Sequence, residues 1–232
     1  MLAEPDDILL AGKEGWQSSS GLGRTGPPSR RSELLSESLP VVYLARHGET
    51  AWSLSGRHTG RSDLPLTERG EENARRLGGR LRALHFARVL SSPLQRAART
   101  CELAGFGAAA EVASDLVEWD YGDYEGRTTL EIHAERPGWH LFRDGCPGGE
   151  MPEQVGARAD HLIERLRAVH GDALLFSSGH FLRTLAARWL GLPPAGGRYF
   201  PLGTAGLCVI GYEHDLSEPA IRLWNEAPPS DS

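Results

Sequence analysis

A histidine between an arginine and a glycine directly follows an apolar segment of the chain. Residues 41–45 read Val-Val-Tyr-Leu-Ala, and residues 46–48 read Arg-His-Gly. The apolar segment predicts a buried strand, so the polar residues fall at its carboxyl end, where open α/β sheets bind ligands. An isolated histidine is more often structural, but the guanidinium of Arg46 and a glycine that permits close approach suit an anion, most simply phosphate. We therefore interpret His47 as part of a phosphate site.

Three ordered motifs resemble the histidine phosphatase, or phosphoglycerate mutase-like, superfamily. The first motif is Leu-Ala-Arg-His-Gly-Glu-Thr-Ala-Trp at 44–52, followed by Gly-Arg-His-Thr-Gly at 56–60 and Asp-Leu-Pro-Leu-Thr at 63–67. The segment 91–100, Ser-Ser-Pro-Leu-Gln-Arg-Ala-Ala-Arg-Thr, resembles the family's second phosphate-binding segment. The segment 118–126, Glu-Trp-Asp-Tyr-Gly-Asp-Tyr-Glu-Gly, resembles its acid-carrying loop. The resemblance implies an α/β three-layer sandwich whose mostly parallel central sheet carries helices on both faces.

The resemblance further implies that His47 is the nucleophile. A neutral imidazole can attack phosphorus and hold the phosphoryl group as phosphohistidine, which divides one difficult displacement into two easier ones. The transferred group carries spread negative charge, so fixed cations and hydrogen-bond donors must stabilise it. Arg46 and Arg96 match the family's positions for this role. Without the motif, Arg96 would be interpreted as a solvated helix residue.

Departure of the alcohol requires a proton, which a carboxylic acid can supply and later take back from water. Glu118 matches the position of the family's proton donor, and Glu125 in the same loop is a competitor. Thr59 and Gly60 resemble the family's substrate-contacting turn, with Arg57 beside them as a second anion contact. An ordinary surface turn is an equally good interpretation of these three residues.

The chain departs from the family after residues 173–177. Relatives typically read His-Gly there, the histidine being a second phosphate-binding residue, whereas this chain reads Ser178, Gly179 and then His180. Serine can donate one hydrogen bond to phosphate but carries no charge, so a charge-assisted contact is lost. We expect His180 to replace the missing imidazole and the helix N-terminus to favour an anion at the same place. The alternatives are a histidine that merely begins a helix and an impaired site.

The acceptor of the phosphoryl group decides the reaction. Cofactor-dependent mutases resemble one another in a long basic segment after the acid loop, which this chain lacks. Residues 135–139 and 142–150 instead resemble the sedoheptulose-1,7-bisphosphatase-like branch. The prediction is a phosphomonoesterase acting on a phosphorylated sugar or related small metabolite. A phosphoglycerate mutase and a weakly active phospholigand-binding homologue are the alternatives.

No cofactor or metal is expected. Members of the family need none, and His133, His140 and Cys146 are too irregularly spaced to predict a metal site. Residues 21–26 match the dinucleotide pattern Gly-x-Gly-x-x-Gly. They follow a serine run rather than a strand, and Pro-Pro rather than a helix comes next, so we reject a nucleotide site there.

Alternating strands and helices must position these residues. Helices are predicted at about 67–84, 94–103 and 152–169, and a further helix is predicted to follow the strand at 173–177 and to run through 190. Further strands are predicted at 87–91, 173–177, 207–212 and 220–224. The Ser-, Gly- and Pro-rich residues 1–39 are expected to be a disordered extension, with the phosphatase domain at 40–226 and a tail at 227–232.

The composition of the chain indicates which classes of binding partner and which cell compartment to expect. With 25 Lys and Arg against 31 Asp and Glu, the net charge of −6 offers no basic field for nucleic acid or anionic membrane. A small-molecule phosphomonoester is therefore the expected partner. Three cysteines without a Cys-x-x-Cys pair argue against a disulfide framework and for a reducing cytoplasm. No apolar run reaches the ~20 residues that a membrane span needs, and the acidic N-terminus is unlike a secretory signal.

Overall fold

The computed structural model describes residues 39–228. The extension expected at 1–39 therefore lies outside the described residues except for Leu39, as does most of the tail expected at 227–232. The strands are β1 (Val42–Arg46), β2 (Arg88–Ser91), β3 (Ala110–Val112), β4 (Ala173–Ser177), β5 (Leu207–Tyr212) and β6 (Pro219–Glu226). The α-helices are α1 (Ala51–Leu54), α2 (Glu68–Leu81), α3 (Gln95–Leu103), α4 (Thr129–Glu135), α5 (Leu141–Asp144), α6 (Pro152–Arg167) and α7 (Gly179–Trp189). Short 3₁₀ segments lie at Gly107–Ala109, Ser114–Leu116, Gly122–Tyr124 and Pro194–Tyr199.

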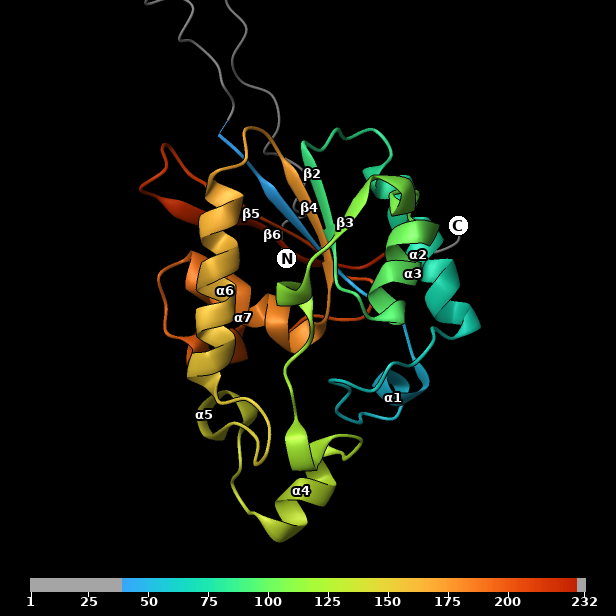
Figure 1. The fold of residues 1–232 in the computed structure, drawn as a ribbon, viewed down its shortest axis with the longest axis vertical. Helices are drawn as coiled ribbons and strands as arrows, with labels where there is room; N and C mark the ends of the chain where they lie inside the picture. The colour runs from blue at the N-terminus through green and yellow to red at the C-terminus, as the bar shows by residue number, and fades with distance from the viewer. Residues whose placement is uncertain (1–38, 229–232) are drawn as a thin grey trace, which may run out of the picture. The chain divides into compact units, whose positions relative to one another are not determined.

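The six strands form one sheet in the order β3-β2-β4-β1-β5-β6 (Figure 1). The first four strands in this order run parallel, and β5 and β6 add an antiparallel edge. In the register of β1 with β4, Arg46 lies opposite Ser177. The residues that follow these two strands, His47 and Ser178, are therefore neighbours at the carboxyl ends of the parallel strands, where ligands bind in open α/β folds.

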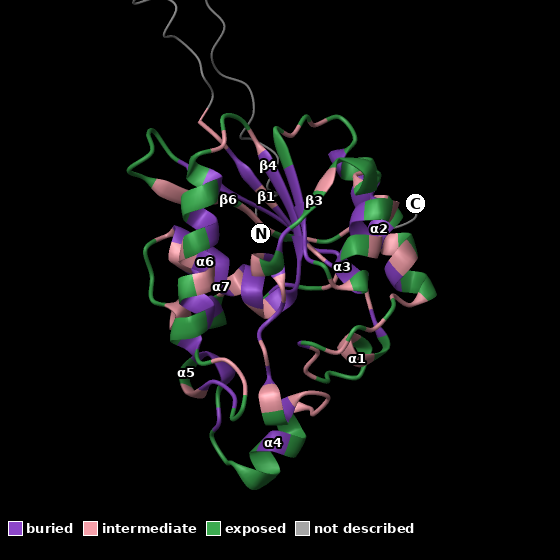
Figure 2. Ribbon diagram, viewed as in Figure 1, coloured by how far each residue is buried: buried purple, intermediate pink, exposed green. Residues whose placement is uncertain are grey.

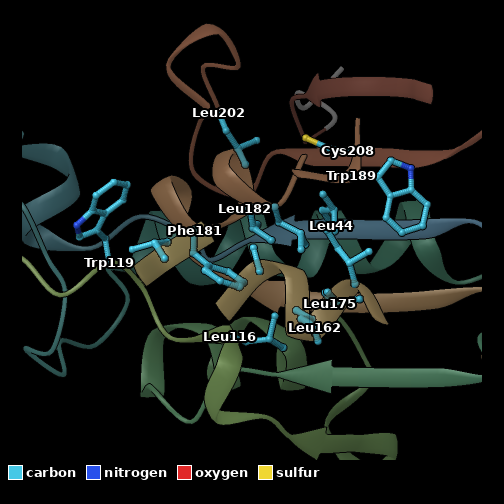
Figure 3. Packing of buried hydrophobic residues seen from close by; sticks show 14 of the residues in the cluster. Leu44, Leu116, Trp119, Leu162, Leu175, Phe181, Leu182, Trp189, Leu202 and Cys208 are labelled. Carbon is cyan, nitrogen blue, oxygen red and sulfur yellow. The ribbon is translucent and has the colours of Figure 1, made fainter. Parts of the chain in front are cut away.

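Helices cover both faces of the sheet, with α2 and α3 on one side and α6 and α7 on the other (Figure 1). Alternate residues of a strand point to opposite faces, so a strand buried on both faces is apolar throughout. In β1, Leu44 joins the core under α6 and α7, whereas Ala45 joins the core under α2 and α3. Figure 2 shows the buried strands between helices that are exposed on their outer faces. Figure 3 shows Leu44 and Leu175 among the residues of the first core.

The predicted mostly parallel sheet with helices on both faces is confirmed, and each predicted strand and long helix is present within a few residues. Three short helices and one short strand were not predicted from the sequence: α1, α4, α5 and β3. These elements are short, and three of them bury little apolar surface: β3 spans three residues that are exposed or half-buried, α1 buries none, and α4 buries only Ile132. They therefore lack the apolar periodicity on which prediction depends. No helix within residues 39–228 is long and apolar enough to cross a membrane.

Candidate active site

A cavity of about 250 Å³ opens at the carboxyl ends of the parallel strands. Five segments that are distant in the sequence line it: the end of β1, the stretch from α1 to residue 59, the loop after Val117, the first turn of α4 and the first turn of α7. The lining residues are Arg46, His47, Ser53, Gly56, Arg57, His58, Thr59, Glu118, Tyr121, Thr129 and His180. Four of the five predicted catalytic residues thus lie around one cavity.

The backbone and ring of His47 are both fixed. Its N–H donates to the carbonyl oxygen of Ser177 at 2.9 Å, and its own carbonyl accepts from the N–H of Ala205 at 2.9 Å. The ring nitrogen Nδ1 lies 2.7 Å from the carbonyl oxygen of Gly48. Because a carbonyl only accepts, Nδ1 carries the ring proton and Nε2 keeps its lone pair.

The charge state of His47 suits a nucleophile. Burial, together with the positive charges of Arg46 and Arg96, holds the pKa of His47 well below its ordinary value of 6.5. The imidazole is therefore neutral at neutral pH. Within residues 39–228, Nε2 has no hydrogen-bond partner, and the ring borders the cavity. The arrangement presents an unprotonated nitrogen to whatever occupies the cavity.

Gly48 serves packing rather than ligand approach. A Cβ on Gly48 would collide with the carbonyl oxygen of Gly70 in the first turn of α2. The N–H of Gly48 donates to the hydroxyl of Thr100 on α3 at 3.0 Å. The sequence interpretation, in which this glycine lets a ligand approach, is therefore wrong: the glycine lets α2 approach the backbone beside His47.

Both predicted arginines hold backbone carbonyl groups through their terminal nitrogens and leave Nε without a partner among residues 39–228. Arg46 donates through Nη1 to the carbonyl oxygen of Leu202. Arg96, which is fully buried, donates through Nη1 to the carbonyl of Ser62 at 2.9 Å and through Nη2 to that of Gly60 at 2.9 Å. Its guanidinium thus holds the turn after His58 in place and does not line the cavity.

Three buried side-chain polar atoms in residues 39–228 have no hydrogen-bond partner: Nε of Arg46, Nε of Arg96 and the hydroxyl oxygen of Ser178. Each belongs to a residue that ends, or closely follows, one of the strands β1, β2 and β4. Unpaired buried donors are costly and rare, and these three atoms are available to donate to an acceptor.

Glu118 occupies the N-terminus of α7. Its Oε1 accepts the N–H groups of Trp119 at 2.9 Å and Phe181 at 2.8 Å, and its Oε2 accepts that of His180 at 3.0 Å. The side chain of Glu118 therefore occupies the N-terminus of α7. From the sequence, we expected the bound phosphate to lie there. Glu118 is 4 % exposed and borders the cavity.

Glu125, the competing acid, has a structural position. Its carboxylate accepts the N–H of Gly60 at 2.9 Å and that of Ser62 at 3.0 Å. It therefore fixes the same turn that Arg96 holds from the other side. Glu125 does not line the cavity, so geometry favours Glu118 as the acid.

His180 lies in the cavity wall as expected. Its Nδ1 lies 2.6 Å from the hydroxyl of Tyr121, and its ring centroid lies 6.0 Å from that of His58. Burial, and then the nearby charge of Arg183, lowers the pKa of His180 well below 6.5, and burial lowers the pKa of His58 to about 4. Both rings are therefore neutral donors or acceptors at neutral pH. His58 and Tyr121 were not singled out from the sequence, although each lies within a quoted motif.

Comparison with known proteins identifies the family of the chain. The profile of the histidine phosphatase superfamily, branch 1, matches residues 42–227. The chain belongs to the histidine phosphatase superfamily. A relative from Mycobacterium tuberculosis named acid phosphatase is 42 % identical over 185 residues, which cover 78 % of this chain and 90 % of that protein. The sedoheptulose 1,7-bisphosphatase of Saccharomyces cerevisiae is 37 % identical over 186 residues, which cover 66 % and 68 %.

Solved structures of other histidine phosphatase relatives share the fold. The structure of an open reading frame from M. tuberculosis matches with a TM-score of 0.78 and 38 % sequence identity. The match covers 82 % of this chain and 99 % of that one. The two chains thus share the mixed α/β fold.

The remaining predicted substrate contacts of this histidine phosphatase divide into two groups. Arg57 and Thr59 line the cavity, and Arg57 is held by the carbonyl oxygen of Gly126 at 2.6 Å. Gly60 and Gly179 act by being small: a Cβ on Gly60 would lie 2.5 Å from the carbonyl oxygen of Trp119, and one on Gly179 would lie 3.1 Å from Cζ of Arg46. Ser178 is fully buried between these segments.

Proposed function

We propose that the protein is a phosphomonoesterase that hydrolyses a phosphorylated sugar or related small metabolite through a phosphohistidine on His47. The observation that carries the proposal is a buried, neutral imidazole whose unprotonated Nε2 faces the cavity beside two guanidinium groups. A phosphate ester fits this arrangement, because such an ester is both an electrophile and an anion.

In the first step, Nε2 of His47 forms a bond to phosphorus while the bond from phosphorus to the ester oxygen breaks. Glu118 donates a proton to the departing oxygen, which leaves as an alcohol. In the second step, a water molecule gives a proton to Glu118 and attacks phosphorus, and the bond between phosphorus and Nε2 breaks. Inorganic phosphate then leaves, and both residues have returned to their starting states.

The unpaired donors would hold the transferred group. Nε of Arg46, which lines the cavity, can donate to a phosphate oxygen there, and Nε of Arg96 and the hydroxyl of Ser178 are further unpaired donors at or after neighbouring strand ends. Glu118, the proposed proton donor of the first step, borders the same cavity.

A second hollow of about 180 Å³ adjoins the cavity and supports the choice of substrate class. The two share His58, Thr129 and His180, and the second adds the rings of Trp139 and Phe142 and the charge of Arg183. Aromatic faces pack against the C–H surfaces of a sugar, while imidazole and hydroxyl groups bond to its hydroxyls. The named activity of the yeast relative, which acts on a sugar bisphosphate, points in the same direction.

Phosphate release from a panel of sugar phosphates tests the proposal. We expect turnover of at least one sugar phosphate without added metal or cofactor. Transfer between 2- and 3-phosphoglycerate that depends on 2,3-bisphosphoglycerate would instead identify a mutase. Binding of phosphorylated ligands without turnover would identify a phospholigand-binding protein.

His180 is the proposed substitute for the family's second histidine, and its removal should slow phosphate release. His180→Ala removes one neutral hydrogen-bond donor, so kcat/KM should fall up to about tenfold. Ser178→His places an imidazole at the family's usual position and measures whether the native site is impaired. A silent His180→Ala together with a gain of tenfold or more in Ser178→His would show that His180 does not compensate.

We also propose that the enzyme works in the cytoplasm. Cys101, Cys146 and Cys208 are buried and unpaired, and burial raises the pKa of each thiol to about 12, so they remain reduced and unreactive. Recovery of the protein in the cytosolic fraction of its native cell is expected, and secretion would contradict the proposal.

A further inference from the structure

Tyr121 and His180 form a short hydrogen bond at the edge of the cavity. The Tyr121 hydroxyl oxygen lies 2.6 Å from Nδ1 of His180. Tyr121 is 1 % exposed, and its ring packs against that of His58 with centroids 4.8 Å apart. On the other side, the ring of Phe142 lies 5.5 Å from that of His180. Aromatic neighbours therefore hold both partners of the bond in place.

The direction of this hydrogen bond follows from counting protons. The phenol of Tyr121 is neutral, since burial raises its pKa well above 10, and the imidazole of His180 is neutral as well. If Nδ1 carried the imidazole proton and donated it, the phenolic proton would need another acceptor. Within residues 39–228, the Tyr121 hydroxyl has no second hydrogen-bond partner. A buried hydroxyl left without an acceptor is costly, so donation from the hydroxyl to Nδ1 is favoured.

We propose that Tyr121 is a positioning residue that holds His180 as the tautomer with its proton on Nε2. Within residues 39–228, Nε2 has no hydrogen-bond partner, and the ring borders the cavity, so this tautomer directs a neutral N–H donor at the ligand. The opposite tautomer would direct a lone pair there, which would repel phosphate oxygens.

The acid loop then controls His180 at two points. Glu118 accepts the backbone N–H of His180 at 3.0 Å, and Tyr121, three residues later, binds its ring. The backbone contact fixes where the side chain begins, and the ring contact fixes which nitrogen carries the proton. This inference rests on the proposed function for its consequence, a donor to the phosphoryl or leaving-group oxygen, but the tautomer itself is independent of activity.

Nitrogen-15 NMR of the imidazole rings at neutral pH tests the tautomer directly. The His180 signals are identified by their absence from the spectrum of His180→Ala. We expect a protonated Nε2 and an unprotonated Nδ1 in the native protein, and a shift toward the other tautomer in Tyr121→Phe. A native proton on Nδ1, or an unchanged tautomer in Tyr121→Phe, would overturn the inference. Neither result depends on phosphate release, so failure of the proposed function would be recognised separately.

A double-mutant cycle tests whether Tyr121 affects phosphate release through His180. Tyr121→Phe should lower kcat/KM by up to about tenfold, the worth of one hydrogen bond. In the His180→Ala background, removal of the hydroxyl should have no further effect, because Tyr121 acts through His180. Equal losses in both backgrounds would show a merely structural role. The matched control is Tyr124→Phe in the same loop, whose hydroxyl has no hydrogen bond to His180.

Discussion

Replacement of His47 by alanine is expected to abolish phosphate release from every substrate that the native protein hydrolyses. The variant loses the atom that forms the bond to phosphorus, so kcat should fall by at least about 10⁴-fold, as for other covalent nucleophiles. The positive charges of Arg46 and Arg96, which act on His47 in the native protein, remain in the variant. Affinity for inorganic phosphate should therefore persist while turnover disappears.

The measurement is phosphate release by His47→Ala beside calorimetric binding of phosphate. His85→Ala is the matched control, since His85 is exposed and lies outside the cavity wall. The control should retain native activity. Turnover by His47→Ala at more than about one hundredth of the native rate would contradict the assignment of the nucleophile.

The second large effect is expected from Glu118→Gln. Glutamine cannot donate the proton that the departing alcohol requires, so hydrolysis of a sugar phosphate should slow by ~10²–10⁴-fold. With p-nitrophenyl phosphate the first step should be almost unaffected, because p-nitrophenolate leaves without a proton. The ratio of the two losses, measured under conditions where the first step limits the rate, separates an acid from a residue that only maintains the site.

Glu118→Gln should also destabilise the protein, which must be measured separately. In the native protein each carboxylate oxygen accepts at least one backbone N–H group. In glutamine an NH₂ group, which cannot accept, replaces one of the two oxygens, so the N–H group that bonded to that oxygen loses its acceptor. A loss of about 1–3 kcal/mol in the free energy of unfolding is expected from one unsatisfied buried donor. Glu125→Gln is the control: it disturbs backbone contacts of the turn at 60–62 and should slow both substrates alike. Equal losses in the rate of the first step on both substrates in Glu118→Gln would count against the acid role.

Local patterns explain what could be predicted from the sequence. The apolar residues of β1 and the polar residues after them define a strand and its carboxyl end, and both depend only on neighbours in the chain. The same holds for α2, where Thr67 caps the helix by accepting the N–H of Gly70 at 3.0 Å. His47, Arg46 and Arg96 were found because each lies in a motif at such a strand end.

Contacts between distant segments could not be predicted in this way. Glu118 accepts backbone N–H groups at the N-terminus of α7 because the acid loop passes that end of the helix. One of these groups belongs to His180, which follows Glu118 by 62 residues in the chain. The pairing of Tyr121 with His180 depends on the same crossing. Arg96 was expected to point at phosphate, yet most of its donors hold the backbone at 59–62, a contact that no local pattern encodes.

The central claim is the covalent intermediate on His47, and trapping it is the most direct test. Glu118→Gln turning over p-nitrophenyl phosphate should form the phosphoenzyme readily but hydrolyse it slowly, since the second step needs Glu118 to accept a proton from water. Mass spectrometry after an alkaline quench should find one phosphoryl group per chain, on His47 and labile to acid. A phosphoryl group on another residue, or continued turnover with His47 unmodified throughout, would contradict the account.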